Sequence, residues 1–162
     1  MKNDILTTVS FYEYSNINIA FSIKTKQLDL TSLTHVLKLP PTRGYTNGEK
    51  YVGKRLNTDS KIVELVDSQR PWTLFVYETK GLVQSTRFKE HAEHLITKLT
   101  LIEENLKALI DQPDNFEILI QIYLTIDKDQ SHFGFSATPE QLKTLANFCH
   151  LIEWRNASSN SH

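Results

Sequence analysis

Apolar and polar residues alternate with the period of a β-strand in two segments, one near the start of the chain and one beyond its middle. In residues 17–23 every odd position is isoleucine or phenylalanine, and in residues 117–126 every even position is isoleucine or leucine. Successive side chains of a strand point to opposite faces of a sheet, so both segments predict strands with one buried face. Residues 7–14, before the first strand, also have an extended pattern.

Three segments show the spacing of an amphipathic helix instead. In residues 29–37 leucine and valine recur at steps of three or four, and Pro40 stops the run. Asp29 or Thr31 can cap the first turn of this helix. In residues 138–148 a Thr-Pro-Glu-Gln start forms a capping box and predicts another short helix.

The longest helical pattern occupies residues 86–111 and ends before Pro113. Its apolar residues follow steps of four and three without interruption, which predicts one long helix or two helices stacked in line. These residues are Phe88, Ala92, Leu95, Leu99, Ile102, Leu106 and Leu109.

The remaining strand patterns predict two hairpins and a final strand. Residues 61–66 and 71–78 are rich in β-branched and aromatic residues and are separated by a turn-like segment, which predicts the first hairpin. The second joins the strand at 117–126, through a turn at 127–130, to residues 132–136. Residues 151–155 then form the last strand.

This order of elements predicts an α+β fold. Helices on one face of a largely antiparallel sheet would bury every apolar stripe, and a ferredoxin-like second half is the more specific alternative. A length of 162 residues suits a single domain. We expect that domain to occupy residues 1–156 and to be followed by a flexible tail, 157–162.

The composition of the chain indicates its cellular compartment and limits the classes of partner that it could bind. A formal charge of −1 provides no net field to attract nucleic acid or an anionic membrane. Cys149 is the only cysteine, which excludes a disulfide framework within the chain and indicates a reducing compartment. The first residues lack the apolar region of a signal peptide, and no apolar run approaches the roughly 18 residues that cross a bilayer. We expect a cytoplasmic protein without a membrane partner.

The segment PPTRGYTNGEKYVGKR, residues 40–55, holds three of the five glycines and four of the eighteen lysines and arginines. It is not a phosphate-binding P-loop, because only three residues separate Gly44 from Gly48 and Tyr51 stands where the hydroxyl ligand belongs. Its basic and aromatic residues could contact a phosphate backbone by charge and stacking. The competing interpretation is a solvated loop whose glycines serve turns.

Two histidines on the long helix are the main candidates for a metal site. His91 and His94 lie three positions apart, so both can face one way and, with Glu90 or Glu93, hold a divalent metal. A third ligand at a recognisable spacing is missing. A charged outer helix face is the competing interpretation, and we expect no metal and no other cofactor.

Nucleophilic chemistry has little support in the sequence. Cys149 and His150 are adjacent, but a buried cysteine beside Phe148 is typical of core packing. His35, between apolar positions, predicts a partly buried histidine bonded to a carbonyl. No serine elbow, paired acidic motif or dinucleotide fingerprint is present, so we assign no catalytic residue.

The strand aromatics are the remaining candidates for a binding surface. Trp72 and Trp154 fall in predicted strands, and a sheet covered on one face leaves the other open to partners. Core packing is the competing role for each ring. The candidate binding residues of the chain are Arg43, Tyr45, Lys50, Tyr51, Lys54, Arg55 and Trp72.

The stretch LKLPPTRGYTNG, residues 37–48, followed by the PWTL of residues 71–74, resembles the bacterial family catalogued as domain of unknown function 4279. The likeness covers residues 17–155 and includes the early strand, the short helix, the turn at Pro41 and the final strand. The family has no established activity. The resemblance implies a small accessory protein, since similar proteins are encoded in bacterial gene neighbourhoods that include toxins and their immunity partners.

These observations together predict a non-catalytic protein–protein interaction domain. Its most specific form is a bacterial immunity protein that binds and neutralises a cognate secreted toxin. The alternative is a small-ligand-binding protein or enzyme that uses residues 40–55 as a lid over a pocket lined by Trp72 and the long helix.

Overall fold

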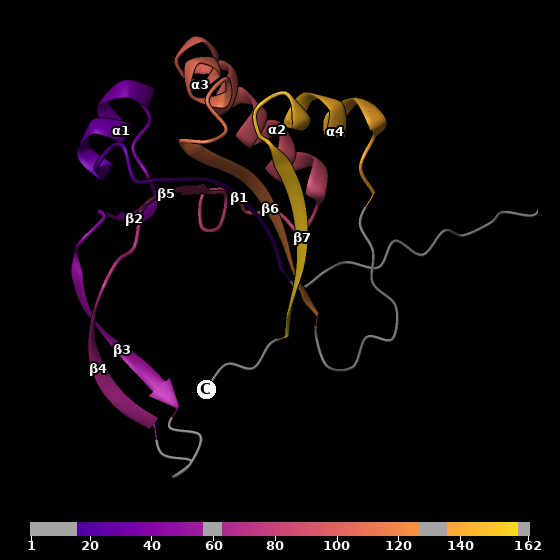
Figure 1. The fold of residues 1–162 in the computed structure, drawn as a ribbon. Coiled ribbons are helices and arrows are strands. Elements are labelled where there is room, and N and C mark those ends of the chain that lie inside the picture. The colour runs from indigo at the N-terminus through magenta and orange to yellow at the C-terminus, as the bar shows by residue number, and fades with distance from the viewer. Residues whose placement is uncertain (1–15, 57–62, 127–135, 159–162) are drawn as a thin grey trace, which may run out of the picture.

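The computed structural model describes residues 16–56, 63–126 and 136–158, which form an α+β fold (Figure 1). Five strands build the main sheet in the order β2-β5-β1-β6-β7. Their bounds are Asn16–Thr25 for β1, Arg43–Tyr45 for β2, Thr73–Glu78 for β5, Phe116–Ile126 for β6 and Leu151–Ser158 for β7. Two further strands, β3 (Lys50–Leu56) and β4 (Val63–Gln69), pair with each other in a separate ribbon that we call the arm.

Strand β1 is the centre of the sheet. It pairs antiparallel with β5 on one side and with β6 on the other, with Phe21 opposite Tyr77 and Ile120. The predicted largely antiparallel sheet is therefore confirmed. Strands β6 and β7 are parallel neighbours, with Ile120 opposite Ile152. A ferredoxin-like half would place another strand between the two that a helix connects, so this direct pairing differs from that alternative.

All the described helices lie on one face of the main sheet, as predicted (Figure 1). They are α1 (Leu30–Leu37), α2 (Phe88–Thr100), α3 (Glu103–Ile110) and α4 (Pro139–Ala146). Asp29 caps α1 by accepting a hydrogen bond from the Ser32 amide at 2.6 Å, and this bond holds the pKa of the Asp29 carboxyl below its usual value. Thr138 and Gln141 form the predicted capping box of α4.

The long helical pattern forms two helices, α2 and α3, which meet at Leu101 and Ile102. Every member of the predicted apolar ladder is buried under them. Leu101 lies outside the ladder and is exposed, whereas Ile102 continues into the core. Glu103 and Glu104 begin α3, where the positive end of the helix dipole favours carboxylates.

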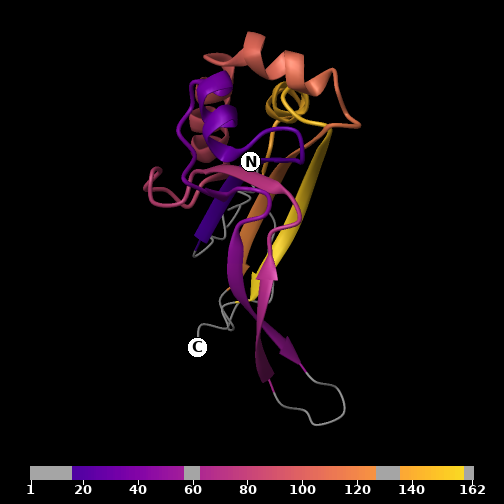
Figure 2. The ribbon, with the colours of Figure 1, turned by 60° about the vertical axis from the view of Figure 1, so that its left-hand side comes forward.

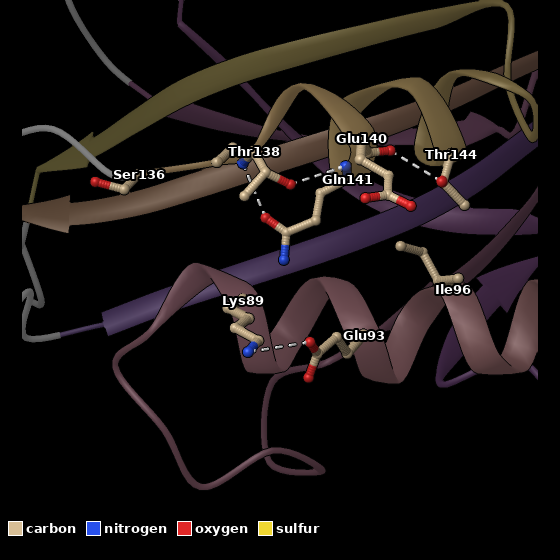
Figure 3. Close-up of a pocket in the computed structure, with 9 residues that line it drawn as sticks. Lys89, Glu93, Ile96, Ser136, Thr138, Glu140, Gln141 and Thr144 are labelled. Atoms are coloured by element: carbon tan, nitrogen blue, oxygen red, sulfur yellow. Dashed lines mark hydrogen bonds and ion pairs between the residues drawn. The ribbon is translucent and has the colours of Figure 1, made fainter.

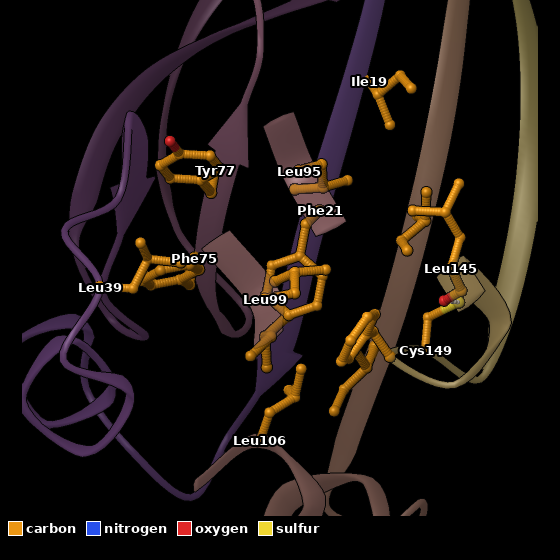
Figure 4. Close-up of a cluster of buried hydrophobic side chains, with 14 of the residues drawn as sticks. Ile19, Phe21, Leu39, Phe75, Tyr77, Leu95, Leu99, Leu106, Leu145 and Cys149 are labelled. Atoms are coloured by element: carbon orange, nitrogen blue, oxygen red, sulfur yellow. Dashed lines mark hydrogen bonds between the residues drawn. The ribbon is translucent and has the colours of Figure 1, made fainter. Parts of the chain in front are cut away.

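The core lies between the helices and the inward face of the sheet (Figure 4). The odd positions of β1 and the even positions of β6, which alternate in the sequence, supply its sheet side. Phe21 and Phe75 meet edge to face at a centroid distance of 6.4 Å, under Leu95 and Leu99 of α2. This packing explains why the two alternating strands were evident from the sequence.

No helix of the described residues lies on the opposite face of the sheet, which we call the open face. The buried residues on this face are either small, such as Ala20, or lie near the centre of the sheet, such as Val76. Polar side chains bond across its strands, including Gln121 to Glu153 at 3.0 Å. The arm leaves the β2–β5 side of the sheet and extends away from the helices (Figure 2).

The first predicted hairpin is wrong in its pairing. Strand β4 pairs with β3, with Lys50 opposite Gln69, whereas β5 pairs with β1 and β2. The arm ladder continues past the strands, because Gly48 donates to the Arg70 carbonyl at 2.8 Å. No side chain of β4 is buried, so the sequence has no buried face that would indicate the partner strand.

Several predicted segments lie outside the described residues: 7–14, residues 61 and 62 of the first hairpin, the turn at 127–130 and most of the strand at 132–136. The second predicted hairpin would pair β6 with residues 132–136. Between residues 119 and 125, however, both sides of β6 are already paired, one with β1 and the other with β7. The last strand is longer than predicted, because β7 continues to Ser158 and takes in the first residues of the expected tail.

We predict that Leu99→Ala lowers the free energy of unfolding by about 2–5 kcal/mol, because Leu99 is fully buried and the truncation leaves a cavity in the core. Leu101→Ala is the matched control, since this side chain is 76% exposed and its loss should change stability by less than about 0.5 kcal/mol. Urea unfolding of both variants tests the prediction, and equal effects would contradict the packing described here.

Candidate functional site at the base of the arm

A cluster of aromatic and cationic side chains joins the arm to the open face of the sheet. At its centre, the guanidinium of Arg70 lies between two tyrosine rings. Its Cζ atom is 4.3 Å from the ring centroid of Tyr45 and 3.9 Å from that of Tyr51. Both distances are within the range of cation–π attraction. Because Tyr45 belongs to β2 and Tyr51 to β3, the stack links the main sheet to the arm.

Trp72 and Lys24 complete this group, which we call the junction cluster. The indole Nε1–H of Trp72 donates to the Tyr45 hydroxyl at 3.1 Å. Lys24 of β1 places its Nζ atom 5.4 Å from the Trp72 ring centroid and forms an ion pair with Glu117 at 2.8 Å. The cluster therefore joins side chains from β1, β2, β3 and the segment between β4 and β5.

The backbone fixes these side chains in place. Tyr45 stands opposite Leu74 in the β2–β5 pair. The Arg70 amide donates to the Glu49 carbonyl at 2.9 Å, which holds Arg70 in register with the start of β3. Gly53 leaves room for the Tyr51 ring on the same face of the arm, since a Cβ at Gly53 would lie 3.3 Å from that ring. Backbone pairing between neighbouring strands therefore brings the two tyrosine rings and the Arg70 guanidinium together.

Gly44 brings β2 close to β5. A Cβ atom at this position would lie 2.4 Å from the Leu74 carbonyl oxygen and 2.9 Å from Leu30 of α1. No side chain fits there without displacing the strand. The solvated-loop interpretation placed the glycines of this segment in turns, but Gly44 serves close packing between strands. Gly48, with φ of 80°, does occupy a turn.

Three of the predicted binding residues meet in the junction cluster: Tyr45, Tyr51 and Trp72. Arg43 lies nearby on β2 and forms an ion pair with Glu78 at 3.4 Å. The other three, Lys50, Lys54 and Arg55, are exposed along β3 and do not contact the stack.

Sequence reasoning missed Arg70 and Lys24. Arg70 belonged to the segment interpreted as a hairpin turn, where a charged residue carries no further information. Lys24 lay just beyond the predicted strand 17–23 and is part of β1 in the structure. The one sequence signal for Arg70 was its position directly before Pro71 and Trp72, because those two residues belong to the stretch that resembles the family.

The two faces of the arm differ in character. Val52, Leu65 and Val63 lie on one face and are 62%, 71% and 56% exposed. Lys54 stands directly opposite Leu65 on this face. We call these three aliphatic residues the apolar stripe. The other face carries Tyr51 and, near the sheet, Arg70, so it turns toward the open face at the base of the arm.

The segment 40–55 is therefore not a loop. It forms β2 and most of β3, with backbone pairing to β5 and β4. Trp72 also lies on the side of the open face, against Lys24, whereas α2 covers the opposite face. Because the sheet separates them, Trp72 and the long helix do not line one pocket, which corrects the geometry expected for a lid.

The two histidines of α2 point into the fold. His91 is buried; its Nε2 donates to the Ser85 carbonyl at 2.9 Å, and its Nδ1 lies 2.6 Å from the Thr79 hydroxyl. His94 is half-buried, with its Nε2 atom 3.0 Å from the Tyr77 hydroxyl. They belong to the inner surface of the helix, so the expected charged outer face is wrong. Among the described residues, no three His, Cys, Asp or Glu side chains gather as metal ligands.

Cys149 packs in the core, as the packing interpretation predicted, and burial raises its thiol pKa to about 11. The neighbouring His150 is no base for it, because Nδ1 accepts from the Ile118 amide at 3.3 Å and Nε2 donates to the Ile110 carbonyl at 2.9 Å. His35 is exposed, which corrects the partly buried histidine expected there.

A shallow groove lies between α2 and α4 (Figure 3). Its polar groups are largely occupied with one another. Lys89 approaches Glu93 at 3.6 Å, and Thr144 donates to the backbone carbonyl of Glu140 at 2.9 Å. Among the described residues, the hydroxyls of Thr138 and Thr144 bond to backbone groups of α4 and to no carboxylate of the groove. The junction cluster and the adjoining arm are therefore the stronger candidate for a functional surface.

Residues 15–156 match the protein family described as "Domain of unknown function (DUF4279)", and the chain belongs to that family. The family resemblance inferred from the sequence is confirmed. No curated protein and no solved structure matches the chain. None of the helices in the described ranges has the length and apolar character needed to span a membrane.

We predict that His94 makes stability depend on pH. Its pKa is lowered by burial, then by the nearby positive charges of Lys98 and His91. Because the folded-state pKa lies below the unfolded value of about 6.5, this contribution is fully present above that pH and is lost as pH falls through the folded-state pKa. Chemical denaturation at pH values from about 7 to 5 should show a shallower loss in His94→Gln than in the native chain. His35→Gln, which alters an exposed histidine, should keep the native slope.

We also predict that Gly44→Ala destabilises the protein by about 1–3 kcal/mol, since the added methyl overlaps the Leu74 carbonyl and forces β2 away from β5. Gly53→Ala is the control within the arm, where the neighbouring atom belongs to the Tyr51 side chain. Thermal and urea unfolding compare the two. A Gly44→Ala protein as stable as the native chain would refute the close approach of β2.

Proposed function

We propose that this chain is a non-catalytic protein–protein interaction domain that binds its partner through the arm. The observation that carries the proposal is the apolar stripe on a ribbon of two strands. Such a ribbon has no core of its own, so its aliphatic side chains stay in water unless another surface covers them. Contiguous exposed apolar groups are a recognised feature of interaction sites.

The surroundings of the stripe suit a binding surface. Lys50, Lys54 and Asp67 stand on the same face, with Lys54 directly opposite Leu65 and Asp67 directly opposite Val52, so charged side chains border the aliphatic groups. Protein interfaces commonly have this arrangement, with a desolvated centre and a solvated rim. Burying the three aliphatic side chains against a partner would contribute about 1.5–3 kcal/mol each at full burial.

The junction cluster supports the proposal by holding the base of the arm. A flexible ribbon would lose conformational entropy on binding, which weakens affinity. Stacking of Arg70 between Tyr45 and Tyr51 restrains the ribbon before the partner arrives. The arm is thus partly preorganised where it leaves the sheet.

The specific role we propose is that of an immunity protein, with a bacterial toxin as the partner. A narrow ribbon that extends beyond its domain can enter a concave surface, and enzyme active sites are concave. An arm that occupies such a cleft blocks substrate without any chemistry of its own. Membership of a family without assigned activity is compatible with this role.

We predict that affinity purification of the chain from its native host yields one stoichiometric partner. Leu65→Asp should weaken that complex at least about tenfold, because it places a charge in the apolar stripe. Leu101→Asp is the matched control, as it changes an equally exposed leucine on the helical side. Both variants should retain native stability within about 0.5 kcal/mol.

The immunity role has a separate readout. Expression of the captured partner alone should stop bacterial growth, and co-expression of the native chain should restore it. Leu65→Asp should fail to restore growth, while Leu101→Asp should succeed. A harmless partner would overturn the immunity role, and equal binding by both variants would overturn the arm as the binding surface.

A further inference from the structure

We propose that Arg70 is a carboxylate-binding site that engages an acidic side chain of the protein partner. This inference rests on the proposed function and names the chemistry of one contact within it. Arg70 is half-buried, and its guanidinium carbon lies over the rings of both Tyr45 and Tyr51. Because Nε is buried, an external ligand would reach the N–H donors of the terminal nitrogens.

The donors of Arg70 have no acceptor within the described part of the chain. Its Nε atom is buried without a hydrogen bond, and no ion pair or hydrogen bond is formed by its terminal nitrogens among these residues. A stacked guanidinium has also lost most of its freedom to search for a distant partner. The charge is held in position without a counterion.

Nearby carboxylates are already engaged. Glu49 accepts a hydrogen bond from the Thr46 amide at 3.1 Å. Glu117 pairs with Lys24 at 2.8 Å, and Glu78 lies 3.4 Å from the Arg43 guanidinium. No carboxylate of the described residues lies within ion-pair distance of the Arg70 guanidinium. We therefore assign its counterion to the protein partner.

Tyr45 adds a second donor at the same place. Its hydroxyl oxygen accepts the indole hydrogen of Trp72, so its own hydrogen remains free to be donated. The guanidinium and this hydroxyl both provide hydrogen-bond donors, while the Tyr45 oxygen already accepts a hydrogen bond from Trp72. The complementary ligand is an anion that only accepts hydrogen bonds, and an ionised carboxylate fits this description.

A carboxylate is favoured over the phosphates of a nucleic acid by the surrounding charge. Nucleic-acid sites use several cations along a backbone. Here Lys24 and Arg43 are each paired with a glutamate, which leaves one uncompensated cation at the junction cluster. A single planar guanidinium matches one carboxylate through two parallel hydrogen bonds.

The test uses the full chain, labelled with ¹⁵N, and end-capped hexaglutamate as the probe. The indole N–H signal of Trp72 reports on the site, and that of Trp154, on the far edge strand, is the internal control. We expect the Trp72 signal to shift saturably below about 10 mM peptide, while end-capped hexaglutamine causes no shift. Arg70→Lys keeps the charge but removes the fork of donors, so it should weaken binding at least about tenfold.

Two further variants keep the test decisive. Arg87→Lys makes the same change at an exposed arginine beside α2, away from the arm, and should leave the affinity unchanged. Tyr45→Phe retains the ring but loses the hydroxyl donor, and should weaken binding about threefold to tenfold. An equal loss in Arg87→Lys, no saturable shift with hexaglutamate, or saturation by inorganic phosphate alone would overturn the carboxylate site.

The two proposals fail in different ways. If the partner captured from the host binds Arg70→Lys as tightly as the native chain but loses Leu65→Asp, the interaction role stands and the Arg70 site is overturned. If Arg70→Lys weakens that complex at least about tenfold and Arg87→Lys does not, the site is supported in the natural complex.

Discussion

Central pairing of β1 is the constraint on which the rest of the structure depends. This strand bonds to β5 and β6 at once and turns its odd side chains toward the helices. Segments far apart in the chain thereby become neighbours. β5 in turn holds β2, and β2 presents Tyr45 to Arg70, so the position of the junction cluster follows from the centre of the sheet.

The two faces of the sheet have separate tasks. The helical face holds the apolar core, together with the buried His91 and Cys149, whose contacts are structural. The open face and the arm carry the unsatisfied donors and the exposed aliphatic groups. Side chains on the side away from the core can change with little effect on folding.

Sequence reasoning succeeded where a buried face leaves a periodic record. The alternation in β1 and β6 and the ladder of α2 and α3 arise from that burial, and their prediction was correct. It failed for the arm, because β3 and β4 bury neither face and so carry no pattern that specifies a partner strand. Tyr45, Tyr51 and Trp72 were found by residue type, but Arg70 required knowledge of the ladder that sets it between two rings.

The exposed arm has a consequence for the dynamics of the molecule. Its ladder is one hydrogen-bonded pair wide and shields few amides from solvent, whereas β1 is enclosed on both sides and on one face. Such a ribbon opens at lower free energy than the sheet that supports it and forms a cooperative unit of its own. Amide hydrogens of β3 and β4 would then exchange with solvent through local opening, whereas those of β1 would exchange only on global unfolding.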